Sequence, residues 1–210
     1  HQLIRGAAEE LATPVTDDFN TPEREGVGAY QLNIRDGQRC STAMAYLEPA
    51  MGRPNLTIVE HALVDRLVVE DGGAVGVRYF VHGEERVDYV QNEIVLCAGA
   101  IGSPQILLRS GIGPTDELVQ ADITPVHGLP GVGKNLQDHL FAVVSREVTT
   151  DATVTVNPLN MAKWLGQYLV TRRGPLSMTP CQGGGFVRTH AGAEIPDIQF
   201  HFTGTSLVPD

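Results

Sequence analysis

The spacing of apolar and polar residues changes several times along the chain. Near the start, Leu3 and Ala7 recur at a spacing of four and Thr13-Pro14 follows, which predicts a helix over 2–10. A long polar stretch rich in turn formers comes next. A loop of this length within a domain is usually functional or covers another part of the protein. Ser41 then begins a second short helix, predicted over 41–47, as its N-cap.

From residue 55 to residue 99 the pattern is that of β-strands. Five short runs of β-forming residues follow one another: LTIV, ALVDRLVVE, AVGVRYFVH, ERVDYV and EIVLCAG. The turns DGG and HGEE separate the middle three, which predicts a three-stranded antiparallel meander. The first and last runs are short and nearly all apolar, as buried parallel strands are.

The last of these runs leads through a tight Ala-Gly-Ala turn into a predicted helix. Ser103-Pro104 supplies an N-cap hydroxyl followed by a proline, which favours a helix start at that point. Gly111 can end this helix in a left-handed conformation. In α/β proteins ligands bind where strands end at such turns, so this turn is a candidate site.

The remainder of the chain predicts a strand, a helix and a further strand. The strand is LFAVVSREVT (140–149), the helix PLNMAKWLGQYLVTRRG (158–174), and the last strand PDIQFHF (196–202). Alternation in PDIQFHF puts three apolar side chains on one face and Gln199 with His201 on the other. A polar strand face of this kind can line a pocket, so Gln199 and His201 are candidate substrate-binding residues.

Charge and cysteine content exclude several classes of function. The net charge is −10, with 15 Lys and Arg against 25 Asp and Glu, and no basic cluster is present. We therefore expect no nucleic-acid partner, because phosphate binding needs clustered cations. No apolar run approaches the ~20 residues of a membrane span. The three cysteines are far apart and no zinc motif occurs, so we expect no metal.

One stretch, GLPGVGKN at 128–135, imitates a phosphate-binding loop. It has the spaced glycines and the Lys134 of such a loop, but Asn135 stands where Ser or Thr would bind Mg²⁺, and Pro130 lies inside it. A Gly-rich connection that allows close backbone packing is the favoured interpretation. Triphosphate binding is the weaker alternative.

Three stretches together resemble the glucose-methanol-choline (GMC) oxidoreductases, and choline dehydrogenase-like members in particular. GAIGSPQILLRSGIG (99–113) resembles the second signature of this family, and GVGKNLQDHL (131–140) resembles a stretch that follows it. The segment that precedes the signature is similar as well; it is DGQRCSTAMAYLEPAMGRPNLTIVEHALVDRLVVEDGGAVGVRY (36–79). The resemblance runs from about residue 17 to residue 139, and GPLS and PDIQFHF extend it toward the end of the chain.

The resemblance implies an α/β (α+β) fold and flavin adenine dinucleotide (FAD) as cofactor. It implies part of a Rossmann-like FAD domain with a β-meander over 51–139, and part of an antiparallel-sheet substrate domain over 140–210. Residues 1–50 would form a cap or substrate-domain segment and a cofactor-covering loop. It places Val64 where backbone meets the adenine, and Cys97, Ala98 and Gly99 near the adenosine. The implied reaction is oxidation of a small-molecule alcohol by hydride transfer to flavin.

Several parts of the family pattern have no counterpart in this sequence. They are the N-terminal G-x-G-x-x-G loop, the first signature beside the flavin and the C-terminal catalytic His, so no catalytic residue is assigned. We therefore expect an internal fragment that is inactive and binds flavin weakly by itself, and whose partner is the remainder of its own chain. The alternative is a stand-alone ligand-binding or accessory module. The alcohol is left open, as is the compartment, with the cytoplasm favoured.

Overall fold

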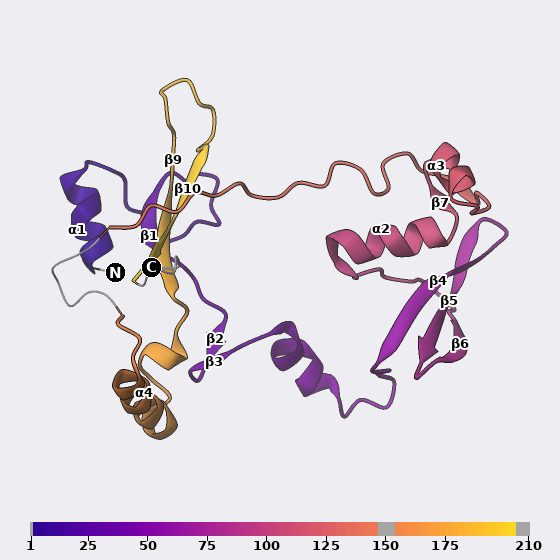
Figure 1. The fold of residues 1–210 in the computed structure, drawn as a ribbon, viewed down its shortest axis with the longest axis horizontal. Coiled ribbons are helices and arrows are strands. Elements are labelled where there is room, and N and C mark those ends of the chain that lie inside the picture. Colours follow the sequence, from indigo (N-terminus) through magenta and orange to yellow (C-terminus); the bar gives the residue numbers. More distant parts are fainter. Residues whose placement is uncertain (1, 147–153, 205–210) are drawn as a thin grey trace. The chain divides into compact units, whose positions relative to one another are not determined.

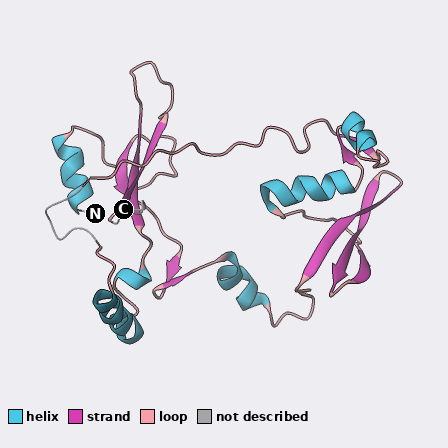
Figure 2. Ribbon diagram, viewed as in Figure 1, coloured by secondary structure: helices cyan, strands magenta, loops and turns pink. Residues whose placement is uncertain are grey.

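The computed structural model describes residues 2–146 and 154–204. The chain divides into two compact units, one formed by Pro54–Ala142 and the other by His1–Arg53 with Val143–Asp210. Both units mix helices with short antiparallel sheets (Figures 1 and 2). The assignment of cofactor and substrate domains to parts of the chain stays a prediction.

The first unit is built on the predicted meander. Strands β4 (Ala62–Glu70), β5 (Gly73–Val81) and β6 (Glu84–Tyr89) pair antiparallel in this order, which confirms the meander. Both turns consist of two residues in the left-handed region, with φ of 49° and 81° at Asp71-Gly72 and 51° and 86° at His82-Gly83. Such turns match the twist of the strands that they join.

The two apolar runs that flank the meander are not strands, which corrects the prediction. Residues 56–59 and 93–98 form no ladder, and Ile58, Val59 and Val95 are 43%, 41% and 73% exposed. A parallel strand exists only beside a partner strand, and the described residues place none next to either run. The strand predicted over 140–149 is also wrong for 140–146, and its other residues lie outside the described ranges.

The helix after the Ala-Gly-Ala turn begins earlier than predicted. α2 spans Gly99–Arg109, so Pro104 lies inside it, and the hydroxyl of Ser103 accepts a hydrogen bond from the Ala98 N–H at 3.1 Å. The proline lacks the N–H that would donate to the Ala100 carbonyl, and its ring crowds that carbonyl. Gly111 ends the helix at φ 78°, as predicted. Short elements follow: β7 (Ile112–Gly113), α3 (Thr115–Gln120) and β8 (His127–Gly128), with β7 and β8 parallel.

A buried carboxylate joins β4 to α2. Asp65 lies at a bulge in β4, with 3% of its side chain exposed. Its oxygens are 2.7 Å from Arg66 Nε and 3.2 Å from Arg78 Nε, and they also pair with Arg109 of α2. Arg109 Nε donates to the Asp65 carbonyl at 3.0 Å. The Ser110 hydroxyl adds a second connection, because it accepts from the Leu67 N–H at 2.8 Å.

The pKa of Asp65 is lowered by this environment. Burial raises the pKa, but hydrogen bonds and positive charge from Arg109 and Arg66 lower it by more. The carboxylate is therefore ionised at neutral pH, and the cluster depends on that charge.

The stretch that resembles a phosphate-binding loop, residues 128–135, forms a turn and is not followed by a helix. Lys134 pairs with Glu117 of α3, Val132 is 8% exposed, and no helix begins at Lys134. A phosphate loop needs that helix, because its N-terminal amide groups hold the phosphates. The triphosphate alternative is therefore wrong.

The second unit has a three-stranded antiparallel sheet of β1 (Gly26–Ala29), β9 (Cys181–Val187) and β10 (Ile198–Thr203), in the order β1-β9-β10. Helix α1 (Gln2–Glu10) has the predicted bounds and buries Ala8. The unit also contains a hairpin of β2 (Ile34–Arg35) and β3 (Gln38–Arg39) and the helix α4 (Pro158–Thr171). Three short helical turns complete it: η1 (Ala43–Leu47), η2 (Glu48–Ala50) and η3 (Pro175–Ser177).

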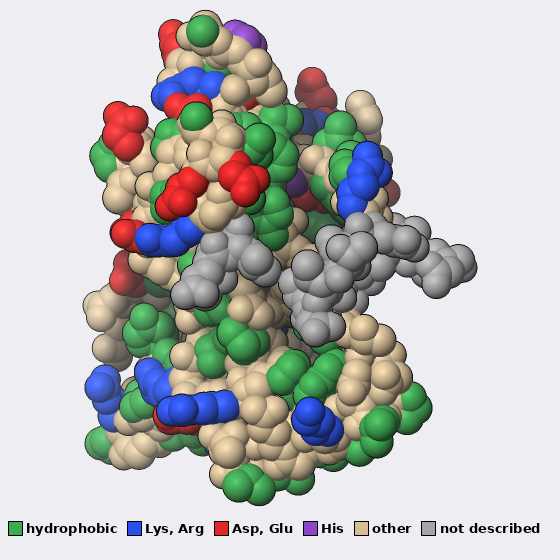
Figure 3. All heavy atoms as spheres, turned by 90° about the vertical axis from the view of Figure 1, so that its left-hand side faces the viewer, with side chains coloured by type: hydrophobic (Ala, Val, Ile, Leu, Met, Phe, Trp, Pro, Cys, Tyr) green, Lys and Arg blue, Asp and Glu red, His purple; other side chains and the backbone are tan. Residues whose placement is uncertain are grey.

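Two helix starts in this unit agree with the sequence. The Ser41 hydroxyl accepts from the Met44 N–H at 3.3 Å, and the Asn157 side chain accepts from the Asn160 N–H at 2.8 Å at the start of α4. Several hydrophobic side chains of α4 are exposed, Val170 at 85% among them. The lower end of Figure 3 shows hydrophobic side chains at the surface, spread among polar and basic ones.

Removing the charge of Asp65 should destabilise the first unit. Asp65→Asn leaves three guanidinium groups without their carboxylate, and we expect a loss of about 2 kcal/mol in the free energy of unfolding, reduced because the arginines are partly exposed. Amide hydrogen exchange of β4 and β5 would measure it. Glu85→Gln is the control, since Glu85 is half exposed and pairs with Arg78 at 3.5 Å; equal effects of both variants would contradict the role of Asp65.

The difference between the wild type and Asp65→Asn should also depend on pH. Because the folded-state pKa is lower than the ordinary value of 3.8, the contribution of Asp65 is complete above that value and is lost as the pH falls through the folded-state pKa. We expect the two proteins to differ equally at pH 7 and pH 5 and to converge below about pH 4. A difference that persists in strong acid would mean that packing, not charge, is what the substitution removes.

Candidate functional site

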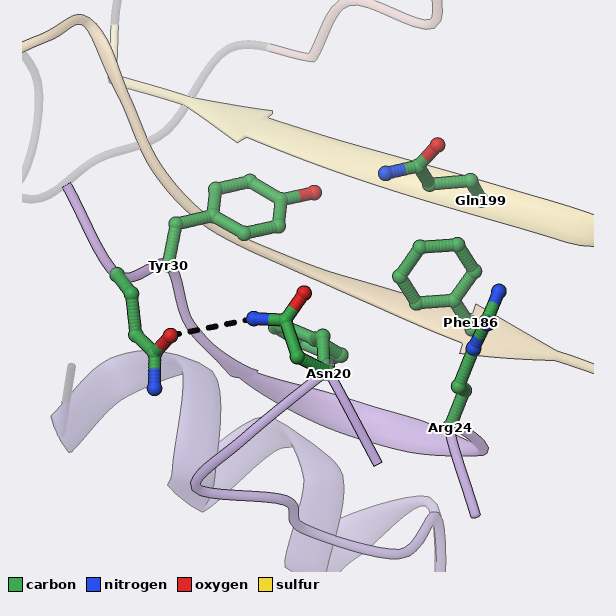
Figure 4. Close-up of a pocket in the computed structure, with 7 residues that line it drawn as sticks. Asn20, Arg24, Tyr30, Phe186 and Gln199 are labelled. Carbon is green, nitrogen blue, oxygen red and sulfur yellow. Dashed lines mark hydrogen bonds between the residues drawn. The ribbon is translucent and has the colours of Figure 1, made fainter. Parts of the chain in front are cut away.

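A pocket of about 500 Å³ opens beside the β1-β9-β10 sheet (Figure 4). This volume lies within the range that holds small organic ligands. The loop before β1, the residues that follow β1, and strands β9 and β10 supply its walls. The lining residues are Phe19, Asn20, Arg24, Tyr30, Gln31, Phe186 and Gln199.

Three aromatic rings form one side of the pocket. The ring of Phe19 lies between those of Tyr30 and Phe186, at centroid distances of 5.5 Å and 5.4 Å, and it meets Phe186 edge-on. Rings in such tilted contacts hold each other in place. A second contact supports the loop, since Asn20 Nδ2 donates to Gln31 Oε1 at 3.2 Å.

Tyr30 connects the pocket to β10. Its hydroxyl donates to the Phe200 carbonyl at 2.9 Å and lies 3.0 Å from His201 Nδ1. Gly184 of β9 leaves the space for this hydroxyl, because a Cβ at Gly184 would collide with Tyr30 Oη and with the Phe200 carbonyl. A residue without a side chain is therefore needed at position 184.

Burial shifts the ionisation of two groups here toward the neutral form. Burial raises the pKa of Tyr30. A hydrogen bond with Gln199 lowers this pKa in part, and the electrostatic effect of Cys181 raises it further. Burial also raises the pKa of the Cys181 thiol. Cys181 Sγ lies 3.6 Å from His201 Nδ1. At neutral pH both hydroxyl and thiol are protonated, so this group of residues donates hydrogen bonds and does not present a thiolate.

The two residues proposed for substrate binding, Gln199 and His201, lie on β10. Gln199 lines the pocket, and His201 is in contact with Tyr30 at a ring-centroid distance of 5.6 Å. The structure thus brings both to Tyr30. Their role toward a substrate stays a prediction.

The sequence pattern indicated neither the aromatic residues of the pocket nor Arg24. All but Phe186 come from the long polar stretch before residue 41, which its length had marked as functional without indicating particular residues. Phe19, Arg24 and Tyr30 follow no helical or strand period. Only the return of the chain beside β9 and β10 brings them together.

The residues proposed to meet FAD lie in the other unit. Val64 is half-buried in β4, next to Asp65, whereas Cys97 and Ala98 precede α2 and Gly99 begins it. The Asp65–Arg109 pair joins these two elements at the far end of α2, about 15 Å along the helix from Gly99. Both parts belong to one unit, but the structure does not bring Gly99 directly to Val64.

The start of α2 is open enough for a flat ligand. Gly99 has φ 81°, and a Cβ built on it would meet nothing within 4 Å. The N-cap residue Ala98 provides no side-chain hydrogen bond to the helix, so the first amide groups of α2 are not capped by a side chain. The backbone at Cys97, Ala98 and Gly99 therefore fits close approach of an adenosine group.

A second pocket, also about 500 Å³, lies beside the Asp65 cluster. Arg66 and Arg109 line it, but both already pair with Asp65, and Asp122 lines it as well. Within the described ranges, no three His, Cys, Asp or Glu residues come together in a way that could hold a metal ion. No helix there has the length and apolar character needed to cross a membrane.

Comparison with known proteins identifies the family. The GMC oxidoreductase family model matches residues 1–141. The chain belongs to the GMC oxidoreductase family. It is 40% identical to the mitochondrial choline dehydrogenase of Mus musculus and 42% identical to the oxygen-dependent choline dehydrogenase of Pectobacterium carotovorum, in each case over 99% of its own length. It spans 35% and 37% of those two relatives.

Solved structures of GMC-type enzymes have the same fold over part of their length. An FAD-dependent oxidoreductase from Chaetomium thermophilum matches 87% of this chain with a TM-score of 0.75 and 26% identity, over 33% of that protein. Pyridoxine 4-oxidase from Mesorbium loti matches 66% with a TM-score of 0.61 and 38% identity, over 27% of its length. The mixed α/β structure therefore corresponds to part of the GMC fold.

Filling the space of Gly184 should disturb the pocket. Gly184→Ala puts a methyl group against Tyr30 Oη and the Phe200 carbonyl, and overpacking of this kind costs about 2 kcal/mol in the free energy of unfolding. Urea unfolding would measure the loss. Gly192→Ala in the loop of the same hairpin is the control, because its Cβ would come no closer than 3.4 Å to a neighbour. A Gly184→Ala protein as stable as this control would show that both Tyr30 and the Phe200 carbonyl can move away freely.

Proposed function

We propose that this chain forms part of an FAD-dependent GMC oxidoreductase that oxidises a small-molecule alcohol to an aldehyde or ketone. The observation that carries the proposal is the identity of about 40% to choline dehydrogenases over 99% of the chain. Identity at this level along the whole chain supports a common cofactor and a common type of reaction. The choice of alcohol does not follow from it.

The backbone around Val64 and Cys97–Gly99 is proposed to hold the adenosine part of FAD. Support comes from the open left-handed Gly99 and from the uncapped amide groups of α2. Bound FAD supplies the acceptor for the hydride that leaves the alcohol carbon. The carboxylate of Asp65 has a structural part in this arrangement, because it fixes α2 against β4 and so fixes both binding segments.

The polar face of β10 is proposed to face the alcohol. The Gln199 amide can both donate to and accept from a hydroxyl group, and Tyr30 and His201 continue the polar face beside it. No residue of this chain is proposed to remove the hydroxyl proton. By itself the chain is therefore expected to be inactive.

Flavin binding by the proposed segment can be tested with a matched pair of glycines. Gly99 and Gly72 both have φ 81° and open space at the Cβ position, but Gly72 lies in the β4–β5 turn. We expect Gly99→Val to weaken FAD binding by about tenfold, roughly 1.4 kcal/mol, because the side chain keeps the adenosine from the backbone. Gly72→Val carries the same backbone strain and should leave FAD binding unchanged. Quenching of flavin fluorescence would measure both.

The reaction type needs a second measurement. In the whole oxidoreductase of which this chain is proposed to form part, with FAD bound, anaerobic addition of an alcohol should bleach the oxidised-flavin absorbance. A protein that binds small hydroxyl compounds yet never reduces flavin would instead be a binding or accessory module.

Equal loss of FAD binding in Gly99→Val and Gly72→Val would remove the support for the adenosine site.

A further inference from the structure

The pocket beside β10 carries a charge that its surroundings leave uncompensated. Arg24 is the charged residue among the seven that line it, and its side chain lies beside Phe186 in Figure 4. No hydrogen bond or ion pair among the described residues engages the Arg24 guanidinium.

Acidic side chains near Arg24 have other partners or lie away from the pocket. Glu25 pairs with Arg188, whose N–H also donates to it at 3.2 Å. Asp18 accepts from the Asn20 N–H at 2.8 Å and from the Asn20 amide at 3.3 Å. Glu23 is exposed and does not line the pocket. The guanidinium is thus available to an incoming anion.

The remaining lining groups define the shape of such a ligand. Phe19, Tyr30 and Phe186 offer ring surfaces to a flat group, and an arginine beside aromatic rings binds a carboxylate through its planar array of donors. Gln199 offers its amide to a hydroxyl group on the β10 side. Aromatic rings alone would attract a quaternary ammonium ion, but a positive charge in the same pocket repels it.

We propose that this pocket selects aromatic alcohols that carry a carboxylate and disfavours cationic alcohols such as choline. The proposal rests on the proposed function, because it names the substrate class of the same site. Arg24 is the specificity-determining residue: it binds the carboxylate, while the rings hold the flat body of the substrate and Gln199 faces its hydroxyl group.

Binding of three probes tests the proposal. The probes are para-(hydroxymethyl)benzoate, benzyl alcohol and choline, titrated against the chain and followed by NMR shifts of the pocket residues. We expect the benzoate to bind about fivefold more tightly than benzyl alcohol, as an exposed ion pair permits, and choline to bind most weakly. The preference for the benzoate should decrease in high salt.

Two variants assign the preference to Arg24. Arg24→Gln should make the benzoate and benzyl alcohol bind equally, and Arg24→Lys should keep part of the difference. Arg35→Gln removes an exposed arginine of β2 that does not line the pocket and should change nothing. Choline binding as tightly as the benzoate, absence of saturable benzoate binding, or an unchanged preference in Arg24→Gln would each overturn the proposal.

Flavin reduction in the whole oxidoreductase of which this chain is proposed to form part, loaded with FAD, separates this proposal from the proposed function. If alcohols reduce the flavin and choline is the fastest, the function stands and the carboxylate preference is wrong. If the benzoate binds through Arg24 and no alcohol reduces the flavin, the pocket is selective but the oxidoreductase assignment fails. Reduction by the benzoate ahead of both other probes supports both.

Discussion

The buried carboxylate of Asp65 is the interaction on which the Pro54–Ala142 unit depends. A charge with 3% side-chain exposure is stable only with partners, and here three arginines surround it. Two of them, Arg66 and Arg78, come from the sheet, whereas Arg109 comes from the last turn of α2. The helix cannot shift along β4 without breaking the Asp65–Arg109 pair. The segment at Gly99, which begins the same helix, takes its position from this attachment.

The sheet of the other unit depends on three glycines, whose lack of side chains lets neighbouring groups come close to β9. Gly183, Gly184 and Gly185 lie consecutively in β9, between β1 and β10. Each is in close contact with the backbone of a neighbouring strand and with a side chain packed against it. Because β9 carries no bulk at these positions, Tyr30 can reach the Phe200 carbonyl across it. The aromatic side of the pocket follows from this contact, since Phe19 packs on Tyr30 and Phe186.

Local patterns predicted the elements that are stabilised by local contacts. The meander, α1 and α4 have short turns, capping residues or a clear period, and the sequence located all three. The runs 56–59 and 93–98 looked equally regular, but a parallel strand depends on a partner elsewhere, and the described part of the chain places none beside them. Gln199 was placed by strand alternation. Phe19, Arg24 and Tyr30 could not be placed, because their proximity depends on a loop whose course no period describes.

The glycines of β9 also determine which positions can adjust the pocket. A side chain at 183, 184 or 185 would collide with backbone atoms or with packed side chains, so the part of β9 that supports Tyr30 and Phe186 admits almost no variation. The opposite wall belongs to a loop, where Phe19, Asn20 and Arg24 carry no ladder hydrogen bonds. A change of substrate in a protein built this way would therefore come from substitutions in the loop, while the glycines of β9 stay the same.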